Sequence, residues 1–366
     1  MIAVGETSLS AVATGGLQTE IREFKLPCIA PDEGILRVEI VGVCGTDVSH
    51  YRMLREPMIL GHHVIGHIDR IGEVAAKRWG LKEGDRVAME EYIPCGHCEL
   101  CRTGNYRLCS DTEPGVGIRY GATPIAVSPS LFGGFSEYMY LHPNAVVHKL
   151  PAHVPAVEAA LTLPLSNGFE WMRTIGQIGP GDVVVIQGPG QQGLASALAA
   201  KAAGAKAVIV TGRSTSVRRL ELARQLGADY TVNVSEEDVV VRVREITGGE
   251  MADVVLDVTS GGTEPVVTSL QVVKKHGTVL LGALKHQLFQ EFDLDIIYQK
   301  SLTVKGVRGH NYESVKMAID FVSSGVFPLK LMNSHDYRLA DTDLALRTAG
   351  SMGEPNPLLV TVSPWK

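Results

Sequence analysis

Residues 183–193, with the sequence VVVIQGPGQQG, decide the fold of this chain. A run of β-branched residues ends at Gly188, and Gly188, Gly190 and Gly193 form the pattern G-x-G-x-x-G. An alanine-rich segment predicted to be helical follows, and then a second apolar strand over 207–211. Alone the glycine pattern is weak evidence, but here it lies inside a strand–helix–strand unit. The segment therefore predicts a dinucleotide-binding turn whose backbone N–H groups face a pyrophosphate.

Further strands are expected after this unit, near Asp253, Gly277 and Ser301. Apolar strands that alternate with helical stretches are typical of a parallel sheet with helices on both faces. The predicted fold class is therefore α/β, with a Rossmann-type doubly wound parallel sheet in the second half of the chain.

The residues after the second strand bear on the choice of coenzyme. An acidic residue there binds the ribose 2′-hydroxyl of NAD, whereas an arginine accommodates the 2′-phosphate of NADP. Gly212 stands where the acid is expected, and Arg213, Ser214 and Arg218 follow. A guanidinium can bind a phosphate through two hydrogen bonds. NADP is therefore slightly favoured over NAD, the alternative being a solvated arginine on a loop.

Composition excludes several other classes of protein. The length of 366 residues suits two domains, and no basic cluster accompanies the net charge of -6, which argues against nucleic acid or an anionic membrane as a partner. The stretch 183–200 is uncharged and as long as a membrane span, but its glycine turn predicts a buried strand and helix instead. No basic residue precedes Arg22, so no secretory signal is expected and a cytoplasmic location is predicted.

Four of the six cysteines lie in one short segment, CGHCELCRTGNYRLC, as Cys95, Cys98, Cys101 and Cys109. Four thiolates from one loop can close a tetrahedral shell around Zn²⁺, and a closed shell is typical of a structural site. An iron–sulfur cluster and two local disulfides are the alternatives, but the spacing and the reducing compartment favour zinc.

A second candidate metal site is predicted upstream, where Cys44 and His62 are ligand types suited to catalytic zinc. Near Cys44, the Thr46 hydroxyl could pass on a proton, and Asp47 could accept the N–H of a ligating histidine. His50 is a candidate proton relay or substrate contact. The remaining cysteine, Cys28, reads as a small buried hydrophobic residue.

Together these parts resemble the zinc-containing alcohol dehydrogenases of the medium-chain dehydrogenase/reductase superfamily. The resemblance covers nearly the whole chain and rests on VGVCGTD (41–47), GHHVIGHIDRIGEVA (61–75), CGHCELCRTGNYRLC (95–109) and the glycine turn, in that order. It implies a β-rich, GroES-like catalytic domain made of residues 1–164 and 309–366, with a structural zinc lobe around 92–112. It also implies a coenzyme domain over 165–308, an active site between the domains, and a homodimer or homotetramer.

Carried over residue by residue, the resemblance makes Cys44 and His62 ligands of the catalytic zinc. Thr46 would relay the substrate proton, Asp47 would support His62, and Asn167 would contact the nicotinamide. Gln191 and Gln192 belong to the predicted coenzyme turn and are included among its contacts.

The third ligand of the catalytic zinc stays open, because the chain departs from the family pattern. The family has glutamate where this chain has His63, and Leu163 stands where another ligand is often found. His63 is the nearest residue of suitable chemistry, although adjacent side chains on a strand point in different directions. Glu90, Glu137 or water are the alternatives, with His63 then a packed histidine.

The expected reaction is the reversible oxidation of a secondary alcohol or polyol to its carbonyl by hydride transfer to NAD(P), with zinc as Lewis acid. One alternative is a zinc-free NADPH-dependent quinone or enone reductase of the same superfamily. A catalytically weak binding homologue is the other, because of the changes at His63 and Leu163.

Overall fold

The structure, a computed structural model, describes residues 6–113, 115–289 and 293–366. The chain forms two compact units, Met1–Leu163 with Ile319–Lys366 (unit 1) and Pro164–Ala318 (unit 2). The predicted boundaries, and the catalytic and coenzyme roles of the two domains, stay predictions. The expectation about a secretory signal concerns in part residues 1–5, which lie outside the described residues.

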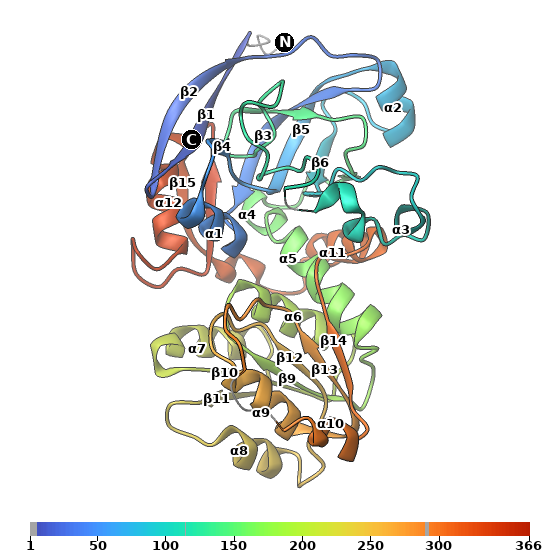
Figure 1. Ribbon diagram of the computed structural model, residues 1–366, viewed down its shortest axis with the longest axis vertical. Coiled ribbons are helices and arrows are strands. Elements are labelled where there is room, and N and C mark those ends of the chain that lie inside the picture. The colour runs from blue at the N-terminus through green and yellow to red at the C-terminus, as the bar shows by residue number, and fades with distance from the viewer. Residues whose placement is uncertain (1–5, 114, 290–292) are drawn as a thin grey trace. The chain divides into compact units, whose positions relative to one another are not determined.

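Unit 2 is built on a parallel sheet in the order β11-β10-β9-β12-β13-β14 (Figure 1). Its strands are β9 (Val183–Gln187), β10 (Ala207–Gly212), β11 (Tyr230–Asn233), β12 (Ala252–Asp257), β13 (Val273–Leu281) and β14 (Thr303–Gly306). From β9 the chain builds outward to β11 on one side and then from β12 to β14 on the other. This reversal confirms the predicted doubly wound Rossmann sheet.

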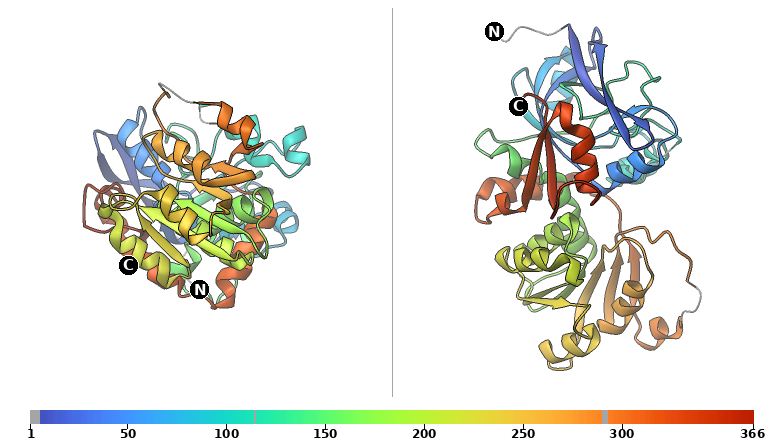
Figure 2. Two further views of the ribbon diagram at one scale, coloured as in Figure 1. Left: turned by 90° about the horizontal axis from the view of Figure 1, so that it is seen from below. Right: turned by 90° about the vertical axis from the view of Figure 1, so that its left-hand side faces the viewer.

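Helices lie on both sides of this sheet (Figure 2). They are α6 (Gln191–Ala202), η4 (Ser214–Ser216), α7 (Val217–Gln225), α8 (Val239–Ile246), α9 (Glu264–Val272) and α10 (Asp295–Gln299), and η3 (Glu170–Ile175) precedes β9. Helices on both faces leave the central strands no solvated side. Val185, Ile209 and Val255 are accordingly fully buried, which explains why these strands are continuous apolar runs.

Unit 1 is β-rich, as the fold prediction requires. One sheet has the order β15-β16-β3-β5-β6-β8 with β7 paired to β3, and a smaller sheet has the order β2-β1-β4. The strands are β1 (Thr7–Gly15), β2 (Gln18–Lys25), β3 (Gly34–Gly42), β4 (Met58–Ile59), β5 (His63–Ile71), β6 (Arg86–Met89), β7 (Tyr138–Leu141), β8 (Val147–Lys149), β15 (Asn333–Arg338) and β16 (Leu359–Ser363). The C-terminal strand β16 therefore completes a sheet that the N-terminal half begins.

Short helices connect these strands and carry the chain between the units. They are α1 (Gly45–Met53), α2 (Glu73–Trp79), α3 (Glu99–Arg102), η1 (Tyr106–Leu108), η2 (Ser110–Thr112), α4 (Ala156–Ala159), α5 (Thr162–Phe169), α11 (Tyr312–Ser324), η5 (Leu329–Met332), η6 (Leu339–Asp341) and α12 (Thr342–Ala349). The core of unit 1 contains fully buried side chains such as Leu36, Val64 and Phe135. This core fixes the edges of β3, β5 and β6, around which the candidate site is built.

Two expectations can be checked at this level. The stretch 183–200 forms β9, a turn and most of α6, and none of the helices in the described residues combines the length and the apolarity that a bilayer span requires. The prediction for Cys28 is wrong: this cysteine is exposed, in the segment that follows β2. Leu26 and Ile29 of the same stretch pack against the core of unit 1, and Cys28 between them faces solvent.

Candidate functional site

Asp47, in the first turn of α1, connects the two segments that carry the predicted metal ligands. Its Oδ2 accepts a hydrogen bond from the Cys44 backbone N–H at 2.8 Å, and its Oδ1 accepts one from the Gly61 N–H at 2.9 Å. Cys44 is the N-cap of α1, so the carboxylate also satisfies a helix end. Asp47 is fully buried, and burial of a carboxylate is tolerated because it is hydrogen-bonded.

The same carboxylate orients His62. Asp47 Oδ1 lies 3.1 Å from His62 Nδ1, and His62 is 5% exposed. A proton on Nδ1 that is shared with Asp47 leaves Nε2 as the metal-binding nitrogen. The predicted support of His62 by Asp47 therefore has the required geometry.

Cys44, His62 and His63 form one cluster, whose ligand atoms all lie within 4.8 Å of one another. His63 is the first residue of β5, and its ring meets that of His62 at an interplanar angle of 83°. The expectation that adjacent histidines diverge does not exclude both from one site, since His62 still belongs to the preceding loop. One thiol and two imidazoles form a donor set that suits zinc. His63 as a ligand stays a prediction, now with compatible geometry.

Charge supports this assignment of the donors. Burial raises the pKa of the Cys44 thiol, but His63 and His62 outweigh burial and lower that pKa to about 5. The thiolate is the form that binds metal. In addition, His63 Nδ1 is buried and has no hydrogen-bond partner within the described part of the chain. An unpaired buried ring nitrogen is unusual for a histidine that only packs.

The two predicted proton-transfer residues lie on α1. Thr46 is exposed, and its Oγ1 is 3.7 Å from Cys44 Sγ. His50 follows one helical turn later, so both side chains lie on the same face of α1. Burial lowers the pKa of His50, and Arg119 adds to that shift although Asp47 opposes it. A neutral His50 can accept a proton, so the relay role stays a prediction with suitable chemistry.

The structural cysteines converge as the spacing predicts. The sulfur atoms of Cys95, Cys98, Cys101 and Cys109 all lie within 4.8 Å of one another. None of the cysteines forms a disulfide in the described residues. Four free thiols at these distances fit a tetrahedral zinc shell, which argues against the disulfide alternative.

The glycine turn between β9 and α6 has the geometry that a pyrophosphate requires. Gly188 has a φ of +104°, which side-chain-bearing residues rarely adopt. A Cβ on Gly193 would lie 1.8 Å from the Gly188 carbonyl oxygen, so only glycine allows this close approach. Gly190 is the N-cap of α6. The first N–H groups of α6 are therefore presented beside a turn without side chains.

The other predicted coenzyme contacts in this turn are arranged around Gln192. Its Oε1 accepts a hydrogen bond from Asn167 Nδ2 at 3.1 Å, and Asn167 Oδ1 lies 2.9 Å from His310 Nδ1. Gln191 Nε2 is buried and has no hydrogen-bond partner in the part of the chain that the structure describes. An orphaned donor at a helix N-terminus fits an anionic ligand there. His310 was not predicted, because no motif accompanies it in the sequence.

Comparison with known proteins decides the family. The family model described as "Alcohol dehydrogenase GroES-like domain" matches residues 30–152, and that described as "Zinc-binding dehydrogenase" matches residues 193–324. A Mycobacterium tuberculosis protein named "Probable alcohol dehydrogenase adh" is 36% identical over 351 residues, which are 94% of this chain and 95% of that protein. The chain belongs to the zinc-binding alcohol dehydrogenase family.

Other relatives of this dehydrogenase agree with that assignment. An L-threonine 3-dehydrogenase of Pyrococcus horikoshii is 34% identical over 88% of this chain and 89% of its own length. A sorbitol dehydrogenase of Bacillus subtilis is 29% identical over 94% of each chain. The crystal structure of an alcohol dehydrogenase from Thermotoga maritima matches with a TM-score of 0.87 and 25% identity, over 98% of this chain and all of that chain. The protein is thus a zinc-dependent NAD(P) alcohol or polyol dehydrogenase.

Within this dehydrogenase, two of the alternative metal ligands have other partners. Glu90 Oε1 accepts the Tyr106 hydroxyl and contacts His148 Nε2, each at 2.6 Å. Glu137 Oε2 accepts the Leu9 backbone N–H at 2.9 Å. Neither residue belongs to the cluster around Cys44 in the described chain.

The carboxylate that does approach this cluster is Glu91, which the sequence reasoning missed. Its Oε2 lies 3.3 Å from His62 Nε2. Burial raises the pKa of Glu91, but His62 and Arg119 outweigh burial, so this pKa lies below its ordinary value. The sequence did contain a feature that could have indicated Glu91. Two adjacent glutamates, Glu90 and Glu91, follow a strand, and alternation directs their side chains to opposite sides.

The residues predicted to read the coenzyme phosphate lie at the end of β10. Arg213 and Arg218 are exposed, and Gly212 cannot carry a side chain, because its Cβ would lie 2.7 Å from Pro189 Cγ. Ser214 Oγ lies 3.2 Å from Glu236 Oε1, so this surface also carries a carboxylate. The preference for NADP stays a prediction.

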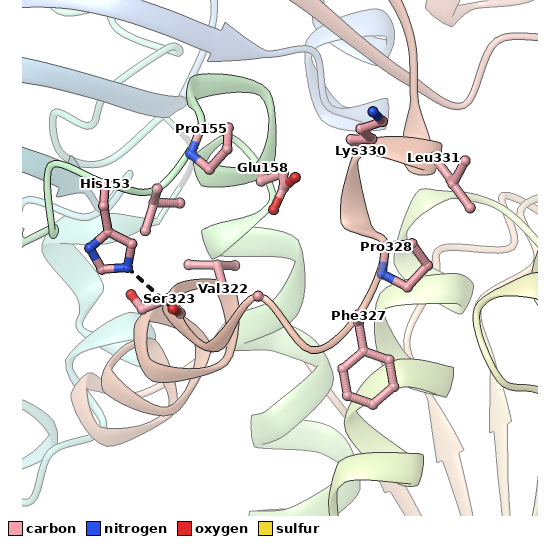
Figure 3. Close-up of a pocket in the computed structure, with 11 residues that line it drawn as sticks. His153, Pro155, Glu158, Val322, Ser323, Phe327, Pro328, Lys330 and Leu331 are labelled. Carbon is pink, nitrogen blue, oxygen red and sulfur yellow. Dashed lines mark hydrogen bonds between the residues drawn. The ribbon is translucent and has the colours of Figure 1, made fainter.

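Unit 1 also contains a cavity of about 380 Å³ (Figure 3). It is lined by residues around α4 and by the segment that ends α11 and follows it. His153 Nε2 faces the Ser323 carbonyl oxygen at 3.2 Å, and Glu158 and Lys330 contribute charges. None of the predicted site residues in the described chain lines this cavity. We therefore assign it no part in the reaction.

Proposed function

We propose that Cys44, His62 and His63 hold the catalytic zinc, and that the protein oxidises a secondary alcohol or a polyol hydroxyl to the carbonyl. The proposal is carried by one observation: a half-buried thiol and two buried imidazoles converge within 4.8 Å. The relatives named for sorbitol and L-threonine support a hydroxyl substrate, since the side-chain hydroxyl of threonine lies on a secondary carbon. The converging donors also argue against the zinc-free reductase.

Zinc, when bound, supplies a Lewis acid that polarises the substrate hydroxyl. The chain's own residues provide the remaining functions. Asp47 holds the His62 ring in one orientation, and Thr46 Oγ1 accepts the hydroxyl proton and passes it on with the help of His50. The turn at Gly188–Gly193 holds the coenzyme pyrophosphate on backbone N–H groups. Hydride transfer then requires the nicotinamide C4 to reach the carbon that bears the hydroxyl.

Coenzyme choice and assembly belong to the same proposal. We infer that Arg213, Ser214 and Arg218 bind a 2′-phosphate, which makes NADP the preferred coenzyme. We also infer that the enzyme is a homo-oligomer, because all four residues of the edge strand β14 are exposed. Unpaired strand edges are available for pairing with another chain.

The test combines metal content with turnover. The wild-type protein should contain two zinc ions per chain and should oxidise members of a panel of secondary alcohols and polyols. Cys44→Ser should leave one zinc ion and abolish turnover, because removing a ligand dismantles the catalytic site. Cys28→Ser is the matched control, since Cys28 is exposed and lies outside both cysteine-containing metal clusters of the described chain.

The alternatives give different results. One zinc ion per wild-type chain together with quinone or enone reduction would establish the zinc-free reductase. Two zinc ions without turnover of any substrate would establish the binding homologue.

A further inference from the structure

A charged side chain outside the three proposed ligands lies against the metal-binding edge of His62. Glu91 Oε2 is 3.3 Å from His62 Nε2, whereas Asp47 takes the opposite ring nitrogen. The Glu91 side chain is 23% exposed and that of His62 is 5% exposed. Glu91 therefore lies on the more exposed side of His62.

The separation of the two atoms fits two ligands of one ion. Ligand atoms that bind zinc tetrahedrally at about 2.0–2.1 Å lie about 3.3 Å from each other. A direct hydrogen bond from a charged N–H to a carboxylate is shorter, at about 2.7–2.9 Å. The distance of 3.3 Å between Glu91 Oε2 and His62 Nε2 places the carboxylate beside the metal-binding nitrogen, within reach of an ion bound there.

Charge gives an independent reason for a carboxylate at this position. The proposed ligands are one thiol and two imidazoles, and an imidazole binds metal as a neutral group. With Cys44 as the only anionic ligand, bound Zn²⁺ and its three ligands would carry one positive charge, and the nearest carboxylate besides Glu91, that of Asp47, lies behind His62 rather than beside the ion. Such a charge is costly unless it is paired. Glu91 supplies the missing negative charge from a different strand end.

The backbone of Glu91 is fixed, but its side chain has freedom. Glu91 follows β6 directly, and its carbonyl oxygen accepts the Tyr120 N–H at 3.0 Å. The carboxylate is not among the atoms that lie within 4.8 Å of one another, so it must rotate to join them. Arg119 interacts electrostatically with Glu91 and can attract the carboxylate when it moves away. This arrangement suits a ligand that exchanges.

We propose that Glu91 is the exchangeable fourth ligand of the catalytic zinc. It binds the ion in the absence of substrate, and it leaves that position when substrate enters. The proposal rests on the metal site proposed above and adds to it a carboxylate at the metal-binding edge of His62.

The experiment compares zinc affinity in the full-length protein with the variant Glu91→Gln. Competition with a chromophoric chelator should show that the catalytic zinc is bound about 10 to 100 times more weakly in Glu91→Gln. Glu137→Gln is the matched control, because this glutamate is a strand-end carboxylate with a backbone partner, and its zinc affinity should equal that of the wild type. Retention of the structural zinc and of the thermal unfolding midpoint establishes that the variants are folded.

A crystal structure of the zinc-loaded, substrate-free protein gives a second readout. A Glu91 oxygen should lie about 2.0–2.2 Å from the ion. A water molecule between Glu91 and the ion, or unchanged zinc affinity in Glu91→Gln, would overturn this inference while the proposed function stands. Absence of zinc beside Cys44 in the wild type would overturn both.

Discussion

Asp47 is the single residue on which the catalytic cluster depends most. The two oxygens of this fully buried carboxylate accept the N–H groups of Cys44 and Gly61 and orient the His62 ring. An amide of the same size can accept hydrogen bonds through only one of its two heavy atoms. The geometry of the metal site is therefore set by a residue that does not bind the metal.

We expect Asp47→Asn to lower the free energy of unfolding by about 1–3 kcal/mol, because a buried N–H is left without an acceptor. The variant should also bind the catalytic zinc about 10 to 100 times more weakly, because His62 loses its orientation. Denaturant unfolding and chelator competition measure the two effects. Asp238→Asn, at the exposed N-cap of α8, is the control. Wild-type zinc affinity in Asp47→Asn would contradict this role.

Arg213 determines the predicted coenzyme preference. Hydrogen bonds to charged groups contribute about 1.5–3 kcal/mol, so Arg213→Ala should weaken NADP binding about tenfold or more and leave NAD binding unchanged. Isothermal titration with each coenzyme provides the measurement. Arg242→Ala alters an arginine already paired with Glu245 and serves as the control. Equal affinity of wild type and variant for NADP would assign Arg213 to the solvent.

At the level of elements, the turn between β9 and α6 combines two constraints in one short segment. The positive φ of Gly188 fixes the direction of the chain, and the missing side chain of Gly193 lets α6 start against the end of β9. Both constraints are local, which explains why this turn could be predicted from the sequence.

Gly193→Ala should therefore disrupt the turn. The new Cβ would overlap the Gly188 carbonyl oxygen, and relief of such overlap costs about 1–3 kcal/mol. Coenzyme affinity should fall because the N-terminus of α6 moves. Gly190→Ala is the matched control for stability, since its Cβ would meet no atom within 4 Å. Equal thermal unfolding midpoints for the two variants would contradict the steric argument.

The zinc lobe depends on its metal because little else holds it. Residues 95–109 form only α3 and η1, of four and three residues, and no strand crosses them in the described chain. Elements this short are unstable alone. Cys98→Ser should make this segment sensitive to limited proteolysis, whereas Cys28→Ser should not. Cleavage sites mapped by mass spectrometry test this, and resistance of Cys98→Ser would show that the lobe folds without zinc.

The sequence did not predict a strand whose own residue pattern is short. The strands near Asp253, Gly277 and Ser301 were expected from apolar runs and correspond to β12, β13 and β14. Strand β11 was not predicted, because its four residues carry a mixed pattern and it is stabilised by pairing with β10 rather than by its own sequence.

For the whole molecule, the exposed edge strand of unit 2 bears on assembly. Strand β14 ends the sheet of unit 2, and its residues, including Val304, are exposed. We expect light scattering to show a dimer or tetramer, and Val304→Lys to lower the mass, because like charges meet when two β14 edges pair. Val326→Lys, at an exposed position outside the strands, should keep the wild-type mass. A monomeric wild type would contradict the predicted oligomer.

The sequence by itself determined the family, the Rossmann sheet, the four-cysteine lobe, and Cys44 with His62 as candidate ligands. These features were readable because ligand spacing and glycine geometry are constraints among near neighbours in the chain. Only the tertiary structure shows that His63 lies close to Cys44. It also shows that Glu90 accepts a hydrogen bond from Tyr106 and that Glu91 lies beside His62. These contacts depend on how β3, β5 and β6 pair and where each strand ends. A shift of one residue reverses the direction of a side chain, and that register is fixed by the packed core rather than by a local pattern.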